Sequence, residues 1–137
     1  MEICPYSLGN RAWNLIIKLV DANNAGTDMF RRSSGNNSAL VPILNAPKIL
    51  DNIRKTRTQN GIIDMLTINC ERCEFEVLPK LIMHDMLRHF RTIQFASHTT
   101  LFKQSFCIYR QIEQALHRVH YVKYHYKMIW EGWLLKN

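Results

Sequence analysis

Apolar residues recur at helical spacing in two stretches of the first half of the chain. Residues 10–20 place apolar side chains at i, i+3, i+4 and i+7, which favours a short helix, although their β-branched residues leave a strand open. Residues 39–46 are apolar but contain Pro42, which favours an extended edge or connector over a central strand. A second helix is predicted to start at Pro47, since proline suits the first helical position, and to end at the Asn-Gly pair of residues 60–61.

The middle of the chain shows the two-residue period of β-strands. Residues 61–69 are rich in β-branched side chains, and residues 73–78 alternate strictly between apolar positions and acidic positions of a solvated face. A short turn through residues 70–72 would join the two segments. The pattern therefore predicts a β-hairpin over about residues 61–78.

Two further helices are predicted after this hairpin. Pro79 begins one that runs to about Gln94, with its basic residues opposite its apolar stripe. The other starts at Thr99 or Thr100 and runs to roughly Leu135, either as one long helix or as two helices with a bend. Its apolar residues step by three or four along one side: Phe102, Phe106, Tyr109, Ile112, Leu116 and Val119.

These elements predict an α+β fold that is mainly helical, with one β-hairpin, flanking helices and a long amphipathic C-terminal helix. The length of 137 residues suits a single domain over residues 1–137. Within it, residues 21–38 are rich in Asn, Ser and Gly, which predicts a flexible loop.

Positive charge is concentrated in the C-terminal part of the chain. The formal net charge is +7, with 18 Lys and Arg against 11 Asp and Glu. Residues 1–79 hold nine basic and eight acidic residues, whereas residues 80–137 hold nine basic and three acidic residues and all six His. Such an excess favours polyanionic partners: nucleic acid, anionic membrane surfaces or acidic proteins.

The N-terminal sequence and the apolar runs indicate an intracellular, reducing compartment. The N-terminus has no basic segment followed by an apolar one, as a secretory signal would have, and it lacks the character of a transit peptide. No apolar run approaches the ~20 residues that a membrane helix needs, so no transmembrane segment is expected. In such a compartment cysteines more often bind metal or stay free thiols than form disulfides.

Four residues between positions 70 and 89 have the spacing and chemistry of a tetrahedral zinc site. Cys70 and Cys73 are separated by two residues, His84 follows after ten more, and His89 after a further four. Zn2+ is borderline-soft and commonly takes two thiolates and two imidazoles. A hairpin turn would bring the sulfur atoms together, and the helix that follows would present both imidazoles.

With these four residues, segment 68–89 resembles a C2H2 zinc finger. The Cys-to-His spacer of ten residues is shorter than the usual ~12. Apolar residues also fall where a finger places its small core, namely at Ile68, Phe75 and Leu81. The resemblance implies a structural Zn2+ held by Cys70, Cys73, His84 and His89.

Two other interpretations of the cysteine pair stay open. The cysteines can be small apolar core residues, with His84 and His89 on the surface of a basic helix. A redox CxxC motif is less favoured, because the predicted elements place no βαβ unit around the pair.

Residues 117–127 (HRVHYVKYHYK) interleave basic side chains with aromatic ones. This pattern suits contacts to phosphates combined with stacking on unpaired bases. An amphipathic helix with buried aromatic rings and solvated cations fits it as well. The cations expected to contact phosphate are Lys80, Arg88, Arg91, Arg110, Arg118, Lys123 and Lys127.

The favoured function is non-catalytic binding of nucleic acid, RNA or DNA, within a larger assembly of protein subunits. An enzyme is not expected, because the sequence has no phosphate loop, no G-x-S-x-G, no H-E-x-x-H and no dinucleotide fingerprint. One alternative is an accessory, protein-interacting subunit of a large ribonucleoprotein or organellar complex. The other is a basic structural protein of matrix type in peripheral contact with a membrane.

Overall fold

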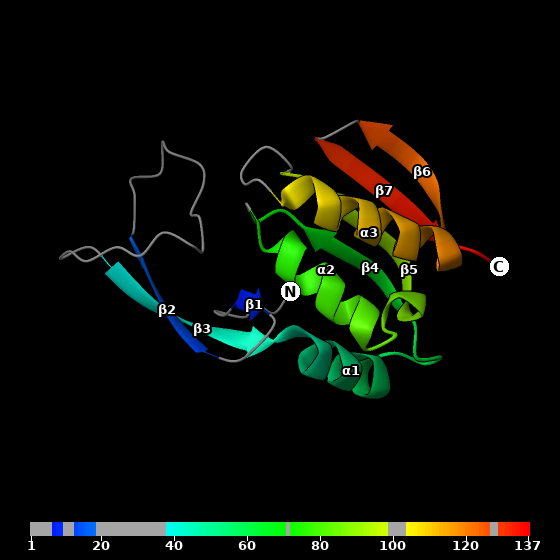
Figure 1. Cartoon of the computed structure of the whole chain (residues 1–137). Helices are drawn as coiled ribbons and strands as arrows, with labels where there is room; N and C mark the ends of the chain where they lie inside the picture. The colour runs from blue at the N-terminus through cyan, green and yellow to red at the C-terminus, as the bar shows by residue number, and fades with distance from the viewer. Residues whose placement is uncertain (1–6, 10–12, 19–37, 71, 99–103, 127–128) are drawn as a thin grey trace.

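The structure, a computed structural model, shows two β-sheets and three α-helices among the residues that it describes (Figure 1). The description covers residues 7–9, 13–18, 38–70, 72–98, 104–126 and 129–137. The smaller sheet has the strand order β1-β3-β2. Its central strand β3 (Ser38–Asn45) is parallel to β1 (Ser7–Gly9) and antiparallel to β2 (Trp13–Lys18).

The larger sheet has the strand order β4-β5-β7-β6. β4 (Ile63–Ile68) runs parallel to β5 (Phe90–Ala96) and is joined to it through helix α2 (Glu74–Met83), so β4-α2-β5 is a βαβ unit. Helix α3 (Ser105–Val119) then leads into an antiparallel hairpin of β6 (His120–Tyr126) and β7 (Trp130–Leu135), and β7 also pairs with β5.

The helices α2 and α3 pack side by side over one face of the larger sheet (Figure 1). Because successive side chains of a strand point to opposite faces, alternate residues of β4 and β5 reach the helices and the others do not. The hydrophobic core fills this layer, with buried side chains from the sheet and from both helices: Leu66, Ile68, Ile93, Phe95, Trp133, Phe75, Leu78, Leu81, Ile112 and Leu116.

Helix α1 (Ala46–Arg57) starts where the proline signal predicts. The side chain of Asn45 caps it by accepting a hydrogen bond from the backbone N–H of Lys48 at 3.0 Å, and Pro47 lies in the first turn. Basic residues in the last turn oppose the negative end of the helix dipole. The predicted helix from Pro47 is therefore confirmed, as is a strand within residues 61–69.

The predicted fold class was wrong in its architecture: the described residues form an α+β fold with a four-stranded mixed sheet, they show no hairpin at residues 61–78, and their last elements are strands instead of a long C-terminal helix. Two expectations for the first half were wrong as well. Residues 13–18 form strand β2 rather than a helix, as their β-branched side chains allow. β3, which contains Pro42, is the central strand of the smaller sheet rather than an edge or a connector.

Residues 73–78 do not form the second strand of a hairpin, because they belong to the start of α2. The strict alternation over six residues fits a strand, but the buried positions Glu74, Val77, Leu78 and Leu81 fit i, i+3, i+4 and i+7 of a helix. Pro79, expected to begin a helix, lies inside α2 instead. The longer window from Glu74 to Leu81 therefore shows the helical period, which is the correct one.

The helix predicted to reach Gln94 ends eleven residues earlier, at Met83. Asp85 adopts a positive φ of 53°, a conformation that stops a right-handed helix and that Asp tolerates better than most residues. After a short 3-10 turn, η1 (Leu87–His89), the chain extends into β5.

The long C-terminal helix is also absent, because α3 ends at Val119 and two strands follow. β-branched and aromatic residues dominate β6, and such residues favour strands. Trp130 and Trp133, three residues apart, would share a helix face, yet on β7 they point to opposite faces of the sheet.

The β6–β7 pairing contains a β-bulge. The register shifts between Val122 and Tyr124, so Lys123 is an extra residue that faces no partner on β7.

Two expectations fall outside the described residues. The flexible loop predicted at residues 21–38 lies outside them apart from Ser38, the first residue of β3, and residues 99–103 of the predicted last helix also lie outside. The organisation of residues 1–137 as a single domain stays a prediction.

His120 is a buried polar residue that should make folding sensitive to acid. Its Nε2 lies 2.9 Å from the carbonyl oxygen of Phe90, which can only accept, so Nε2 carries the proton; the buried Nδ1 forms no hydrogen bond with any residue that the structure describes. Burial is the main influence on the pKa of His120 and lowers it; the bond to Phe90 raises this pKa, and nearby Lys136 lowers it again. The folded state therefore resists protonation of this ring.

Because this pKa is lower in the folded state than the ordinary value of ~6.5, the stability from neutral His120 is present above that value and is lost as the pH falls below it. We expect the free energy of unfolding to decline on going from pH 7 to pH 5, by at most about 1.4 kcal/mol per pH unit for this one group. Urea denaturation at a series of pH values would show a shallower decline in His120→Gln. The matched control is His125→Gln, an exposed position on the same strand, and an equal decline in all three proteins would contradict the prediction.

Candidate functional site

The cysteine pair lies at the carboxyl end of β4, in the turn that enters α2. Cys73 is the N-cap residue of α2, and Cys70 precedes it in the turn. His98 follows the carboxyl end of β5 by two residues. Because β4 and β5 are parallel, their carboxyl ends meet at one edge of the sheet, and ligand sites of such sheets form there. The βαβ unit that the sequence pattern did not predict therefore surrounds the CxxC motif.

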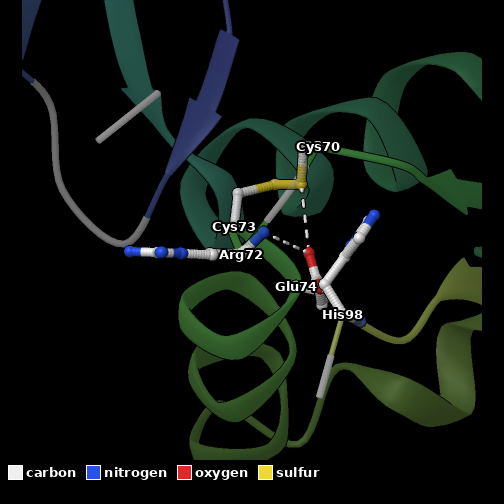
Figure 2. The surroundings of a disulfide bond; sticks show 5 residues. All are labelled: Cys70, Arg72, Cys73, Glu74 and His98. Atoms are coloured by element: carbon white, nitrogen blue, oxygen red, sulfur yellow. Dashed lines mark hydrogen bonds and ion pairs between the residues drawn. A yellow bond between two sulfur atoms is a disulfide. The ribbon is translucent and has the colours of Figure 1, made fainter. Parts of the chain in front are cut away.

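The two cysteine sulfur atoms are joined in a disulfide, as Figure 2 shows. Their Cα atoms are 5.4 Å apart, within the usual range for such a bond. The cysteines differ in exposure: the side chain of Cys73 is buried, whereas Cys70 is only partly buried. An incoming reactant therefore reaches Cys70 more easily.

Glu74, the first residue of α2, is fully buried beside the disulfide. One carboxylate oxygen, Oε2, accepts a hydrogen bond from the backbone N–H of Arg72 at 3.0 Å and lies 3.7 Å from the Cys70 sulfur (Figure 2). The other oxygen, Oε1, accepts from the backbone N–H of His98 at 3.1 Å and lies 2.7 Å from His98 Nδ1. Burying a carboxylate is costly without such partners, so these contacts hold it in place.

The structure does not bring the four predicted zinc ligands together. Cys70 and Cys73 lie at the amino end of α2, whereas His84 is its C-cap residue and His89 ends η1 beyond it. A helix of ten residues is about 15 Å long. Ile68, Phe75 and Leu81, the expected core of a small finger, belong instead to the main core under the sheet. Zinc binding stays a prediction.

Another group of possible metal ligands lies at the disulfide. Among the described residues, Cys70, Cys73 and Glu74 are the group of three whose ligand atoms lie within 4.8 Å of one another. The sulfur atoms are bonded to each other in this structure, so a metal would require the reduced form.

His84 and His89 line a different feature, a cleft of about 420 Å3 between α1 and the segment that follows α2. Asp51 and Arg54 of α1 line it too, together with Asp85. Burial is the main cause that lowers the pKa of His89, and the charges of Arg54 and Arg88 lower it further. The two imidazoles therefore line one cleft at the far end of α2, together with charged residues of both signs.

The predicted phosphate-binding cations are spread over the surface. Three of them form exposed ion pairs: Arg88 with Asp85, Arg91 with Asp64, and Arg110 with Glu113. Exposed pairs of this kind are weak and leave the cations accessible to a phosphate.

Of the other predicted cations, Lys80 lies on α2, Arg118 on α3 and Lys123 on β6, while Lys127 is outside the described residues. Arg88 and Arg118 are brought together, since both line one small cleft of about 180 Å3 beside α3.

Aromatic residues lie on the face of the larger sheet that α2 and α3 do not cover. The strand register aligns Thr67, Gln94, Gly132 and Tyr124 in one row across β4, β5, β7 and β6, on the side opposite the core. We call this side the open face; its other aromatic and exposed apolar residues are Met65, Tyr121, Tyr126 and Trp130.

Hydrogen bonds connect the open face across all four strands. Gln94 Nε2 donates to Thr67 Oγ1 at 2.9 Å, and Tyr124 Oη donates to Gln94 Oε1 at 2.8 Å. Trp130 Nε1 in turn donates to Tyr124 Oη at 3.2 Å. The rings of Tyr124 and Tyr126 lie 6.2 Å apart between centroids, so they form one aromatic surface. Sequence reasoning missed this surface because it treated residues 120–135 as helical; Tyr124 and Tyr126, two residues apart, were the available signal.

Comparison of the chain with protein-family models, with curated proteins and with solved structures finds no match. Among the helices of the described residues, none has the length and apolar character needed to span a bilayer.

Proposed function

We propose that this protein binds single-stranded nucleic acid on the open face of its larger sheet. The observation that carries the proposal is the set of aromatic residues on neighbouring strands β6 and β7, on the side that α2 and α3 leave uncovered. Unpaired bases stack on such rings with little regard to sequence, because every base has a π-face.

The hydrogen bonds of the open face would prepare it for binding. Tyr124 and Trp130 are held by their bonds to Gln94 and to each other, so their rings lose little freedom when a base arrives. Tyr121 and Tyr126 remain 47 % and 66 % exposed and offer the most accessible ring surface.

The charge of the chain would supply the sequence-independent part of the affinity. A net charge of +7 attracts phosphates from a distance and gives an attraction that salt weakens. Lys123 belongs to the same strand as the tyrosines and directly precedes Tyr124 in the sequence. The helix-side cations Lys80, Arg88, Arg110 and Arg118 would act mainly through this long-range field, or on a strand that wraps beyond the sheet.

The test is fluorescence anisotropy with labelled oligo(dT) and oligo(U), and with a DNA duplex, between 50 and 200 mM salt. Base stacking is worth roughly 1–3 kcal/mol per base, so we expect Tyr126→Ala to weaken single-strand binding about 5- to 150-fold. Phe106→Ala is the matched control, because Phe106 is an aromatic residue of comparable exposure, 54 %, that lies on α3 instead of the sheet. Equal affinities of the two variants would show that the open face is not the binding site. A wild-type protein without salt-sensitive binding would contradict the proposal as a whole.

A protein partner on the same face is the second candidate. Met65 is 54 % exposed on the open face and Ile129, just before β7, is 70 % exposed, and such apolar side chains suit a protein interface better than a phosphate chain. This would agree with an accessory subunit of a larger complex. Light scattering after gel filtration separates the two candidates, since a monomer that binds oligonucleotides supports the first and an obligate oligomer supports the second.

A further inference from the structure

The disulfide between Cys70 and Cys73 is poorly suited to stabilise the fold. It links residues only three apart in the sequence, inside one turn. A cross-link stabilises a protein mainly by shortening the loops of the unfolded chain, and this effect is smallest for the shortest loops. The bond also leaves β4, β5 and α3 unconnected to one another. Its presence therefore points to chemistry at the sulfur atoms more than to structural reinforcement.

A buried carboxylate and its hydrogen bonds surround the disulfide. Glu74 is fully buried, and its two carboxylate oxygens contact the Cys70 sulfur and the Arg72 N–H on one side and the His98 residue on the other (Figure 2). These contacts bind the cysteine turn to the end of β5, 24 residues away in the sequence. None of the contacts to Arg72 and His98 requires the sulfur–sulfur bond, so these contacts can persist when that bond opens.

The two cysteines also differ in exposure, which suits them to the two successive steps of a disulfide exchange. Cys70 is partly exposed and can meet a large partner, whereas Cys73 is 7 % exposed and lies at the amino end of α2. The amino end of a helix favours a thiolate over a thiol. A partly exposed attacking sulfur with a buried second sulfur beside it is the arrangement that resolves a mixed disulfide within one molecule.

We propose that Cys70 and Cys73 form a redox-active pair that exchanges disulfides with thiol partners. In the reduced protein, the Cys70 sulfur attacks a disulfide of a partner, forms a mixed disulfide and releases one partner thiol. The Cys73 sulfur then attacks Cys70 Sγ, which forms the Cys70–Cys73 bond and releases the second partner thiol. Two electrons pass from the cysteine pair to the partner, and the two thiol protons end on the two released thiols. The reverse sequence oxidises a partner dithiol.

The experiment uses the full chain in a Cys4→Ser/Cys107→Ser background, so that only the pair can react. The probe is glutathione, supplied as defined mixtures of its thiol and disulfide forms, and the products are read by intact-protein mass spectrometry after alkylation. Cys73→Ala and Cys73→Ser are both prepared, since the position is buried and one replacement can fold better than the other. Circular dichroism checks the fold of each variant, and metal content of the reduced protein is measured in parallel.

We expect the background protein to interconvert fully between dithiol and disulfide without accumulating a glutathione adduct. Either Cys73 variant should accumulate one glutathione on Cys70, whereas Cys70→Ser should accumulate little, because Cys73 is buried. As a matched control, a chain that retains only Cys107, an exposed free cysteine of α3, should form its adduct more slowly than the Cys73 variants.

Three results would overturn the inference: a disulfide that excess dithiothreitol cannot reduce in the folded protein, folded Cys73 variants that form no adduct, or a reduced protein that holds a stoichiometric metal and resists oxidation. The last result would assign Cys70, Cys73 and Glu74 to a metal site. None of these readouts involves nucleic acid, so the outcome is independent of the open face.

Discussion

Replacing Trp133 by alanine is expected to lower the free energy of unfolding by about 4 kcal/mol, a loss typical of large aromatic side chains in cores. Trp133 is fully buried at the centre of β7, where it packs in the core beneath the helices. Its ring forms a T-shaped pair with the ring of His117 from α3, with 4.7 Å between centroids. The expected loss of free energy has two sources: the cavity that the indole leaves, and the lost contact between β7 and α3.

The same change removes a hydrogen bond from a buried acid. Trp133 Nε1 donates to Glu131 Oε2 at 2.7 Å. Burial is the main cause that raises the pKa of Glu131, and the bond from Trp133 lowers it. Without the indole, the carboxylate would lose its charge more readily, and the variant should be relatively less stable at neutral than at acidic pH.

Urea denaturation measures the loss, and Trp130→Ala is the matched control. Trp130 lies on the same strand but only partly buried on the open face, so its removal should cost about 1–2 kcal/mol. Trp133→Phe should fall between the two alanine variants, because it keeps much of the volume and loses the hydrogen bond. Equal losses for Trp130→Ala and Trp133→Ala would show that the core does not lie where we describe it.

Adding a single methyl group at Gly132 is expected to destabilise the fold by about 1–3 kcal/mol, the usual cost of overpacking. The ring of Tyr124 on β6 lies across Gly132 on β7, and a Cβ atom there would sit 2.5 Å from Tyr124 Cζ. Gly132→Ala must therefore move the tyrosine ring, which breaks its hydrogen bond to Gln94 and disturbs the open face.

A double-mutant cycle identifies this cause. In a Tyr124→Ala background the ring is gone, so the further change Gly132→Ala should cost little or nothing. Additive losses from the two changes would mean that the strain at Gly132 arises from its backbone or from another neighbour. If the open face binds nucleic acid, Gly132→Ala should also weaken oligonucleotide binding in the otherwise native protein.

Local signals in the sequence were sufficient for some elements of the fold. Asn45 and Pro47 mark the start of α1 because both act within a single turn of the chain. The β-branched residues of β4 are similarly informative. At residues 73–78 the six-residue alternation gave a wrong prediction, because only the longer window to Leu81 distinguishes a helix from a strand.

The C-terminal strands could not be predicted locally, because their partners are distant. Periodic apolar residues correctly describe α3 up to Val119. Beyond that point the tyrosines and tryptophans fit a helix by spacing, and it is the pairing of β7 with β5, more than 30 residues earlier, that selects the strand.

Only part of the candidate site could be predicted, because the rest depends on residues that are distant in the sequence. The spacing of Cys70 and Cys73 is enough by itself to predict chemistry at their sulfur atoms. Glu74 was interpreted as part of a solvated strand face, since nothing in its neighbourhood shows that it is buried or that it meets His98. Those facts depend on the parallel pairing of β4 with β5, and without that pairing the zinc interpretation was the more attractive one.

The bulge at Lys123 has a consequence for how the molecule behaves at high concentration. β6 is an edge strand of the larger sheet, and its tyrosines and valine would make it a good template for a strand of a second molecule. The extra residue interrupts the regular ladder along this edge and places a lysine in it, and both features discourage edge-to-edge growth. The sheet can thus leave one broad aromatic side in water while its β6 edge is protected against polymerisation.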